Sequence, residues 1–97
     1  MMKSNNYLSL GEAIEKFLER HGLKETAKIQ EVLARWENLM GKPIAGNTEK
    51  IWFNKGTLYI KMKSPIWKNE LLLARNKIRQ MMNDQLKADI IKEVKVW

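Results

Sequence analysis

The 97-residue sequence contains no cysteine, two prolines and a single histidine. Without cysteine the chain forms neither a disulfide framework nor a cysteine-based zinc site, and it has no cysteine nucleophile. Its apolar runs are only a few residues long, which is too short for a membrane-spanning helix. The first residues lack the apolar run of a signal peptide, so we expect a cytoplasmic protein without a membrane partner.

Signals of catalysis are also missing. The sole histidine, His21, follows a predicted helix beside Gly22, where the helix dipole favours a cation. No carboxylate pair lies in the apolar setting that acid–base catalysis needs. No residue set has metal-ligand spacing, and no glycine-rich phosphate loop opens a helix after a strand. We therefore expect no enzyme, no metal, no cofactor and no small-molecule substrate.

Positive charge is unevenly distributed along the chain. The net charge is +7, yet residues 1–40 carry six basic and six acidic side chains, whereas residues 41–97 carry twelve basic and five acidic ones. Such asymmetry is typical of proteins that bind a polyanion, most often nucleic acid. The alternative is that the excess charge serves solubility.

Hydrophobic periodicity and turn signals predict one α+β domain over residues 9–97 after a flexible tail over 1–8. Ser9 and Glu12 have the spacing of a capping box, which starts the first helix. The expected order is α-α-β-β-α-β, a small three-stranded sheet with helices packed on one face. The expected elements are a helix to about Arg20, a helix over 24–40, a loop or single turn over 42–48, strands over 50–53 and 57–62, a helix from Pro65 to about Leu86 with a kink near Asn83, and a strand over 90–97.

A tight hairpin leads into the third helix. Gly56 supplies the positive φ that the turn after Asn54 requires, and Ser64 followed by Pro65 is a helix start. A two-residue loop pairs Trp52 with Tyr59 and separates two faces. The core face holds Ile51, Phe53, Leu58, Ile60 and Met62. The other face holds Lys50, Trp52, Tyr59, Lys61 and Lys63.

Two surfaces are candidates for nucleic-acid binding. Aromatic side chains among lysines stack bases and hold phosphates, which makes Lys50, Trp52, Tyr59, Lys61 and Lys63 the first set. Lys50 opposite Lys61 is unfavourable unless an anion binds. The alternative is that the first helix or a partner chain covers this face. The second set is a basic stripe on the third helix, for which the alternative is a solvated surface: Lys68, Arg75 and Arg79, beside Leu72.

Spaced residues from Trp36 to Leu71 resemble the DciA-type family of bacterial proteins. They are W-x-x-x-x-G from Trp36, I-A-x-x-T from Ile44, and G-x-L-x-I-x-M-x-S-P-x-W-x-x-E-L from Gly56. The resemblance covers roughly residues 10–97. It implies a KH-like domain that binds DNA and has a role in loading or operating a DnaB-type replicative helicase.

The sequence departs from that family in three ways. Asn47 stands where the family often has histidine, and no G-x-x-G clamp of the KH type is present. Many members extend beyond the last strand in a basic tail, whereas this sequence ends at Trp97. The resemblance is therefore compatible with a short form that works through its folded domain, or with one that keeps only part of the function.

These observations predict a non-enzymatic nucleic-acid-binding accessory protein that assists the replicative helicase, with single-stranded or forked DNA as its ligand. One alternative is an RNA-binding or ribosome-associated KH-like module that uses the same surface. The other is a protein–protein adaptor whose first two helices dock a partner without any nucleic acid.

Overall fold

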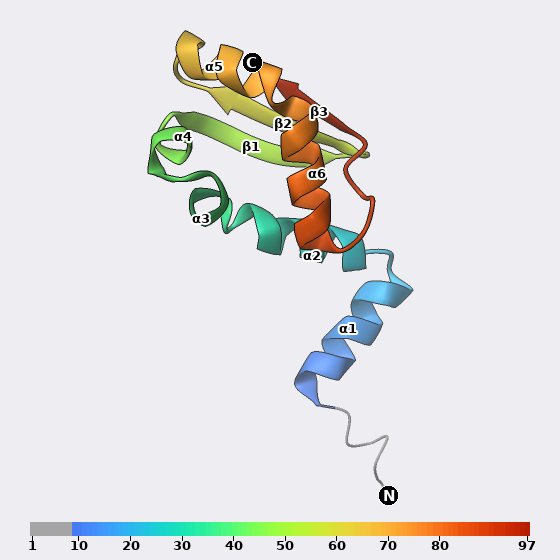
Figure 1. Ribbon diagram of the computed structural model, residues 1–97. Helices are drawn as coiled ribbons and strands as arrows, with labels where there is room; N and C mark the ends of the chain where they lie inside the picture. The colour runs from blue at the N-terminus through green and yellow to red at the C-terminus, as the bar shows by residue number, and fades with distance from the viewer. Residues whose placement is uncertain (1–8) are drawn as a thin grey trace, which may run out of the picture.

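The computed structural model describes residues 9–97, so the predicted tail over 1–8 lies outside the described residues. The fold is a mixed α+β arrangement with an open three-stranded sheet, as predicted (Figure 1). The elements are α1 (Leu10–Arg20), α2 (Lys24–Leu33), α3 (Trp36–Met40), α4 (Lys42–Gly46), β1 (Thr48–Asn54), β2 (Thr57–Met62), α5 (Pro65–Leu73), α6 (Arg75–Leu86) and β3 (Glu93–Val96).

The sheet has the order β1-β2-β3, with β1 antiparallel and β3 parallel to β2. The predicted hairpin register is confirmed, including the pairs Trp52–Tyr59 and Lys50–Lys61. Lys55 and Gly56 form the turn with φ values of 47° and 83°. Two positive φ values in a two-residue loop match the twist of the flanking strands.

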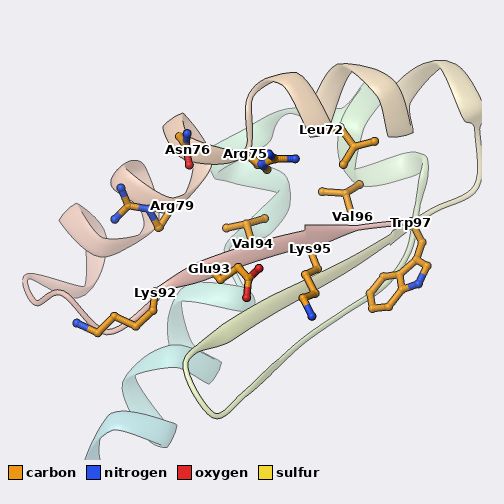
Figure 2. Close-up of a pocket in the computed structure, with 10 residues that line it drawn as sticks. All are labelled: Leu72, Arg75, Asn76, Arg79, Lys92, Glu93, Val94, Lys95, Val96 and Trp97. Atoms are coloured by element: carbon orange, nitrogen blue, oxygen red, sulfur yellow. The ribbon is translucent and has the colours of Figure 1, made fainter.

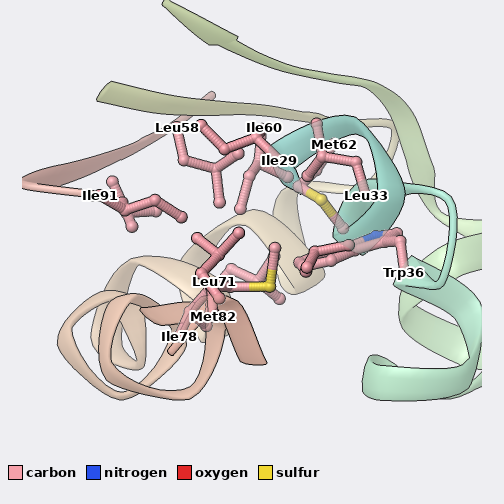
Figure 3. Packing of buried hydrophobic residues seen from close by; sticks show 13 residues of the cluster. Ile29, Leu33, Trp36, Leu58, Ile60, Met62, Leu71, Ile78, Met82 and Ile91 are labelled. Atoms are coloured by element: carbon pink, nitrogen blue, oxygen red, sulfur yellow. The ribbon is translucent and has the colours of Figure 1, made fainter. Parts of the chain in front are cut away.

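The core lies between the sheet and the helices α2, α3, α5 and α6 (Figure 3). The middle strand, β2, contributes Leu58 and Ile60, both fully buried. Ile51 and Phe53 of the edge strand β1 lie on the same face and are half-buried. The other buried side chains are Ile29, Val32, Leu33, Trp36, Met62, Leu71, Ile78, Met82, Leu86, Ile91 and Val94. Across residues 9–97, no helix has the length and apolar character needed to cross a membrane.

Helix α1 begins with the predicted capping box: Ser9 Oγ accepts from the Glu12 N–H at 3.0 Å, and the Glu12 carboxylate accepts from the Ser9 N–H at 3.2 Å. Its apolar stripe, however, does not join the core. No residue of α1 is buried, and Phe17 is 55% exposed. Figure 1 shows α1 projecting away from the sheet. The prediction that the helices pack on one face of the sheet therefore fails for α1, because amphipathic periodicity specifies an apolar face but not what covers it.

Two long predicted helices are each interrupted. The helix expected over 24–40 breaks after Leu33, and the one expected from Pro65 breaks at Ala74, whose φ and ψ are −96° and 6°. The break in this helix thus lies at Ala74 and not near Asn83, where the kink was predicted. The interruption at Ala74 lets α5 contact β2 and β3 while α6 follows β3. Neither interruption contains proline or glycine, so tertiary packing rather than local sequence sets its position.

Asn83 lies within α6, and its side chain bonds to the segment that follows the helix. Its Oδ1 accepts from the N–H groups of Ile90 and Ile91 at 3.2 and 2.8 Å, and its Nδ2 donates to the Ile91 carbonyl at 2.9 Å. These bonds fix the segment that leads into β3. The last strand is consequently shorter than the predicted 90–97, beginning at Glu93.

Candidate nucleic-acid interface

Three aromatic rings gather on the sheet face opposite the helices. Trp52 and Tyr59 are cross-strand partners with ring centroids 5.1 Å apart and planes 6° from parallel. Trp97 lies 5.6 Å from each of them, with interplanar angles of 19° and 24°. Mutual packing of this kind orders the rings and spares an incoming base part of the entropic cost of fixing them. We call Lys50, Trp52, Tyr59, Lys61 and Trp97 the open face.

No helix of residues 9–97 covers the open face. Trp52 and Tyr59 are half-buried, largely by each other and by Trp97, and Trp97 remains 46% exposed. The alternative that the first helix covers this face does not hold, because α1 contacts α2 and projects away from the sheet. The two aromatics predicted from the hairpin therefore keep accessible edges on the side away from the core.

The lysines on this face already have partners within the chain. The Lys50 ammonium lies 4.9 Å from the ring centroid of Trp52, a cation–π contact. Lys61 Nζ lies 3.4 Å from a carboxylate oxygen of Glu49. The repulsion expected between Lys50 and Lys61 is thus relieved without a phosphate. Both side chains are exposed, so each remains available to an anion.

The structure places the eight predicted residues at three parts of the surface: the open-face side of the sheet, a groove beside α6, and α5. Lys63 is exposed just beyond β2, where its N–H donates to the Asn47 carbonyl at 2.7 Å. By strand alternation it continues the side of Lys61. Arg75 and Arg79 instead line a groove between α6 and β3, together with Leu72 (Figure 2). Lys68 is exposed on α5 and does not line that groove.

Trp97 is the residue that sequence reasoning missed. Strand alternation puts Trp97 on the side of Lys95, but no turn signal in the sequence fixes the register of a strand that follows a crossover. The structure pairs β3 in parallel with β2, so that the Trp97 N–H donates to the Ile60 carbonyl at 3.0 Å. Trp97 thereby completes the aromatic cluster and also lines the groove beside Arg75.

The family-like motif around Trp36 has a structural role. Its indole Nε1 donates to Thr48 Oγ1 at 3.1 Å, and that hydroxyl donates to the Ile44 carbonyl at 2.7 Å. These bonds join α3, α4 and β1 beneath the sheet. The motif therefore specifies the fold. The open-face side chains belong to the same hairpin but are not among the residues that define the motif.

Charged groups in the described residues are at the surface. Among residues 9–97, no polar or charged side chain is buried and no cluster of three potential metal ligands occurs. A hydrogen bond from Lys92 is the main cause that lowers the pKa of Asp89. A hydrogen bond to Glu15, with charge attraction from Glu19, raises the pKa of Lys24. These pairs order loops and helix junctions and lie away from the open face.

Together, the fold and the open face define a small mixed α+β protein that presents a basic and aromatic sheet surface. The chain belongs to the family described as Dna[CI] antecedent, DciA, whose model matches residues 9–96. This confirms the resemblance found in the sequence. The family is associated with loading of the DnaB replicative helicase and is not known as a family of enzymes.

A curated relative is a UPF0232 protein from Corynebacterium glutamicum (strain R). It is 27% identical over 89 residues, which cover 92% of this chain and 50% of the relative. The chain therefore spans about half the length of the relative it matches. No solved structure matches the chain, so the KH-like comparison stays a prediction.

Proposed function

We propose that this protein is a non-enzymatic accessory factor that binds single-stranded nucleic acid through its open face and assists loading or operation of the replicative helicase. The observation that carries the proposal is the mutual packing of Trp52, Tyr59 and Trp97 among exposed lysines on a helix-free sheet face. Family membership supports the helicase partner.

The open face provides the two contacts that single strands need. The outer ring faces of the aromatic cluster offer stacking platforms, and stacking contributes about 1–3 kcal/mol per base irrespective of sequence. Lys50, Lys61 and Lys63 offer point charges for phosphates along one side. No predicted element resembles a recognition helix, so we expect little sequence preference and a strong dependence on salt.

Binding to fluorescein-labelled oligothymidine, measured by anisotropy at several salt concentrations, tests the nucleic-acid part. We expect Trp97→Ala to weaken binding by about tenfold or more through lost stacking. Lys61→Glu with Lys63→Glu should weaken it further and flatten the salt dependence. Lys28→Glu with Lys77→Glu changes the net charge equally, on exposed helix surfaces outside the open face, and serves as the control. Equal effects of the two double variants would reject the open face as the site.

Competition with duplex DNA and with RNA of matched length, at one salt concentration, separates the DNA function from an RNA-binding module. Preference for RNA would favour the ribosome-associated alternative, because the same stacking surface serves either single strand.

An adaptor role is the second candidate, and the exposed apolar stripe of α1 favours it. Leu10, Ile14 and Phe17 are 77%, 50% and 55% exposed. The test is co-purification with the replicative DnaB-type helicase, comparing Ile14→Asp with Trp97→Ala. An adaptor loses the helicase with the α1 variant and keeps it with the tryptophan variant. Failure of the unaltered chain to retain the helicase would reject the helicase part of the proposal while leaving nucleic-acid binding to the anisotropy measurement.

A further inference from the structure

A basic groove runs along the outer edge of β3, on the side that no other strand of residues 9–97 occupies. Its volume is about 560 Å³, and its walls come from α5, α6 and β3. Figure 2 shows Leu72 near Val96, Arg75 near Val94 and Arg79 toward Lys92. The chain from α5 to α6 therefore runs alongside β3 in the opposite direction, and the outer edge of β3 stays open.

The backbone of β3 presents unpaired hydrogen-bonding groups at this edge. The Trp97 N–H donates to the Ile60 carbonyl at 3.0 Å, and its carbonyl accepts from the Met62 N–H at 2.9 Å. The alternation of a parallel strand then directs Lys95 toward β2 as well. It directs the N–H and C=O groups of Val94 and Val96 outward, away from β2. The groove thus has two donors and two acceptors along its floor.

The charge of the groove selects an acidic occupant. Four basic side chains line it against one acidic side chain, Glu93. Within residues 9–97, neither Arg75 nor Arg79 forms an ion pair, whereas Lys92 is held by Asp89 at 3.0 Å. Arg79 contributes a weak charge attraction to Asp89, but neither guanidinium group is held in an ion pair among the described residues. Set beside an open strand edge, the two groups favour carboxylates that approach along that edge.

The spacing of the arginines matches an added strand. Arg75 and Arg79 are four residues apart on α6, which is about 6 Å along a helix. Alternate residues of a β-strand are about 6.7 Å apart and point to the same face. Acidic side chains at every second position of a strand added to β3 would therefore face the two guanidinium groups in turn.

We propose that this groove binds an extended acidic segment of a partner protein, which adds to β3 as a fourth strand and places alternate carboxylates against Arg75 and Arg79. Strand addition at an open sheet edge is an established mode of peptide recognition. The proposal goes beyond nucleic-acid binding and does not depend on it. It gives these two arginines a role other than the phosphate contact predicted from sequence.

Hydrogen-bond chemistry favours a peptide over a nucleic-acid backbone here. Phosphate oxygens only accept hydrogen bonds, so a phosphodiester chain would leave the carbonyl groups of Val94 and Val96 unpaired. A peptide strand supplies both donors and acceptors. The opposite sheet edge, on β1, is a poorer template, because its ladder is irregular between Thr48 and Lys50.

The test uses a capped, fluorescein-labelled seven-residue peptide in which glutamate alternates with valine. We expect Arg75→Gln with Arg79→Gln to weaken its binding by about tenfold or more, because both charge partners are lost. Lys28→Gln with Lys77→Gln makes the same change in net charge on exposed sites outside the groove and should leave binding unchanged. A peptide with its glutamates in one block keeps the charge, loses the alternation and should bind more weakly.

Backbone pairing has its own readouts. Amide hydrogen exchange of Val94 and Val96 should slow when the peptide binds, whereas exchange of Lys95, already bonded to β2, should not change. N-methylation at alternate positions removes either the peptide N–H groups that face β3 or those that face away from it. Methylation of the set that faces β3 should abolish binding, and methylation of the other set should preserve it. No peptide binding, or equal binding of both methylated forms, overturns the proposal. So does an arginine double variant that weakens only oligothymidine binding, which would assign the groove to phosphates.

Discussion

The indole of Trp36 donates a hydrogen bond to the hydroxyl of Thr48 at 3.1 Å, across the boundary between the helical half of the chain and the sheet. The indole is buried, and the Thr48 hydroxyl in turn donates a hydrogen bond to the Ile44 carbonyl at 2.7 Å. This short relay gives the tryptophan and the threonine of the motif a shared structural role, whereas Ile44 contributes only its backbone carbonyl. The relay orients α3 and α4 against β1, the strand that carries Lys50 and Trp52.

Replacing Thr48 by valine tests the relay. Thr48→Val keeps the shape but leaves the buried Trp36 N–H without its acceptor, whereas the Ile44 carbonyl still accepts from the Asn47 N–H at 3.1 Å. We therefore expect a loss of about 1–3 kcal/mol in the free energy of unfolding, mainly from the indole N–H. Thr48→Ser keeps the hydroxyl and should cost less. Urea denaturation followed by circular dichroism measures both. If the two variants lose equal stability, the methyl group rather than the hydrogen bond is what matters at this site.

The hairpin turn carries local strain that a substitution can remove. Lys55 has φ of 47°, a conformation that costs most residues about 1–2 kcal/mol but that asparagine adopts more readily. We expect Lys55→Asn to raise the free energy of unfolding by about 0.5–1 kcal/mol. Gly56→Ala should act in the opposite direction, because φ at Gly56 is 83°. Thermal melts of the two variants should therefore shift in opposite directions.

Local patterns predicted what local forces determine. The hairpin register follows from a period of two and a two-residue loop, and the capping box at Ser9 from two side chains three residues apart. The interruption at Ala74 has no such signature, because its position depends on how α5 packs against β2 and β3 and how α6 packs against β3. The position of Trp97 depends on pairing with a strand more than thirty residues earlier, which no turn specifies.

Helix α1 should contribute little to the global stability of the fold. Because it buries no residue, Phe17→Ala should change the global free energy of unfolding by less than about 0.5 kcal/mol. Ile29→Ala, in the core contributed by α2, should cost about 2–5 kcal/mol. Ser9→Ala should speed amide exchange within α1 while leaving the global unfolding transition in place. A large global loss from Phe17→Ala would show that α1 packs on the body in solution.

The Asp89 carboxyl, in the segment between α6 and β3, should titrate at a lower pH in the folded chain than in the unfolded one. Hydrogen bonding and charge attraction from Lys92 lower the pKa of the Asp89 carboxyl below 3.8 in the folded chain. The folded-state value is the lower one, so the pair's contribution is complete above the unfolded pKa and is lost as pH falls through the folded pKa. Carbon-detected NMR titration should show the Asp89 pKa rising toward 3.8 in Lys92→Gln. An unchanged titration would mean that the ion pair is not populated in solution.

Glu49 should limit the affinity of the open face for nucleic acid. Its carboxylate lies 3.4 Å from Lys61 Nζ and competes with phosphate for that ammonium group. We expect Glu49→Gln to tighten oligothymidine binding severalfold at low salt, since removing one acidic partner frees a cation beside the aromatic cluster. Glu31→Gln, an equal charge change on an exposed position of α2, is the matched control.

Lys50→Ala should reduce the salt slope by about 0.7 units, the value for one single-strand phosphate contact. Lys61→Ala should reduce the slope less in the unaltered chain than in the Glu49→Gln background, where Lys61 no longer has its intramolecular partner. If the two backgrounds gave the same slope change for Lys61→Ala, the ion pair would have no part in binding.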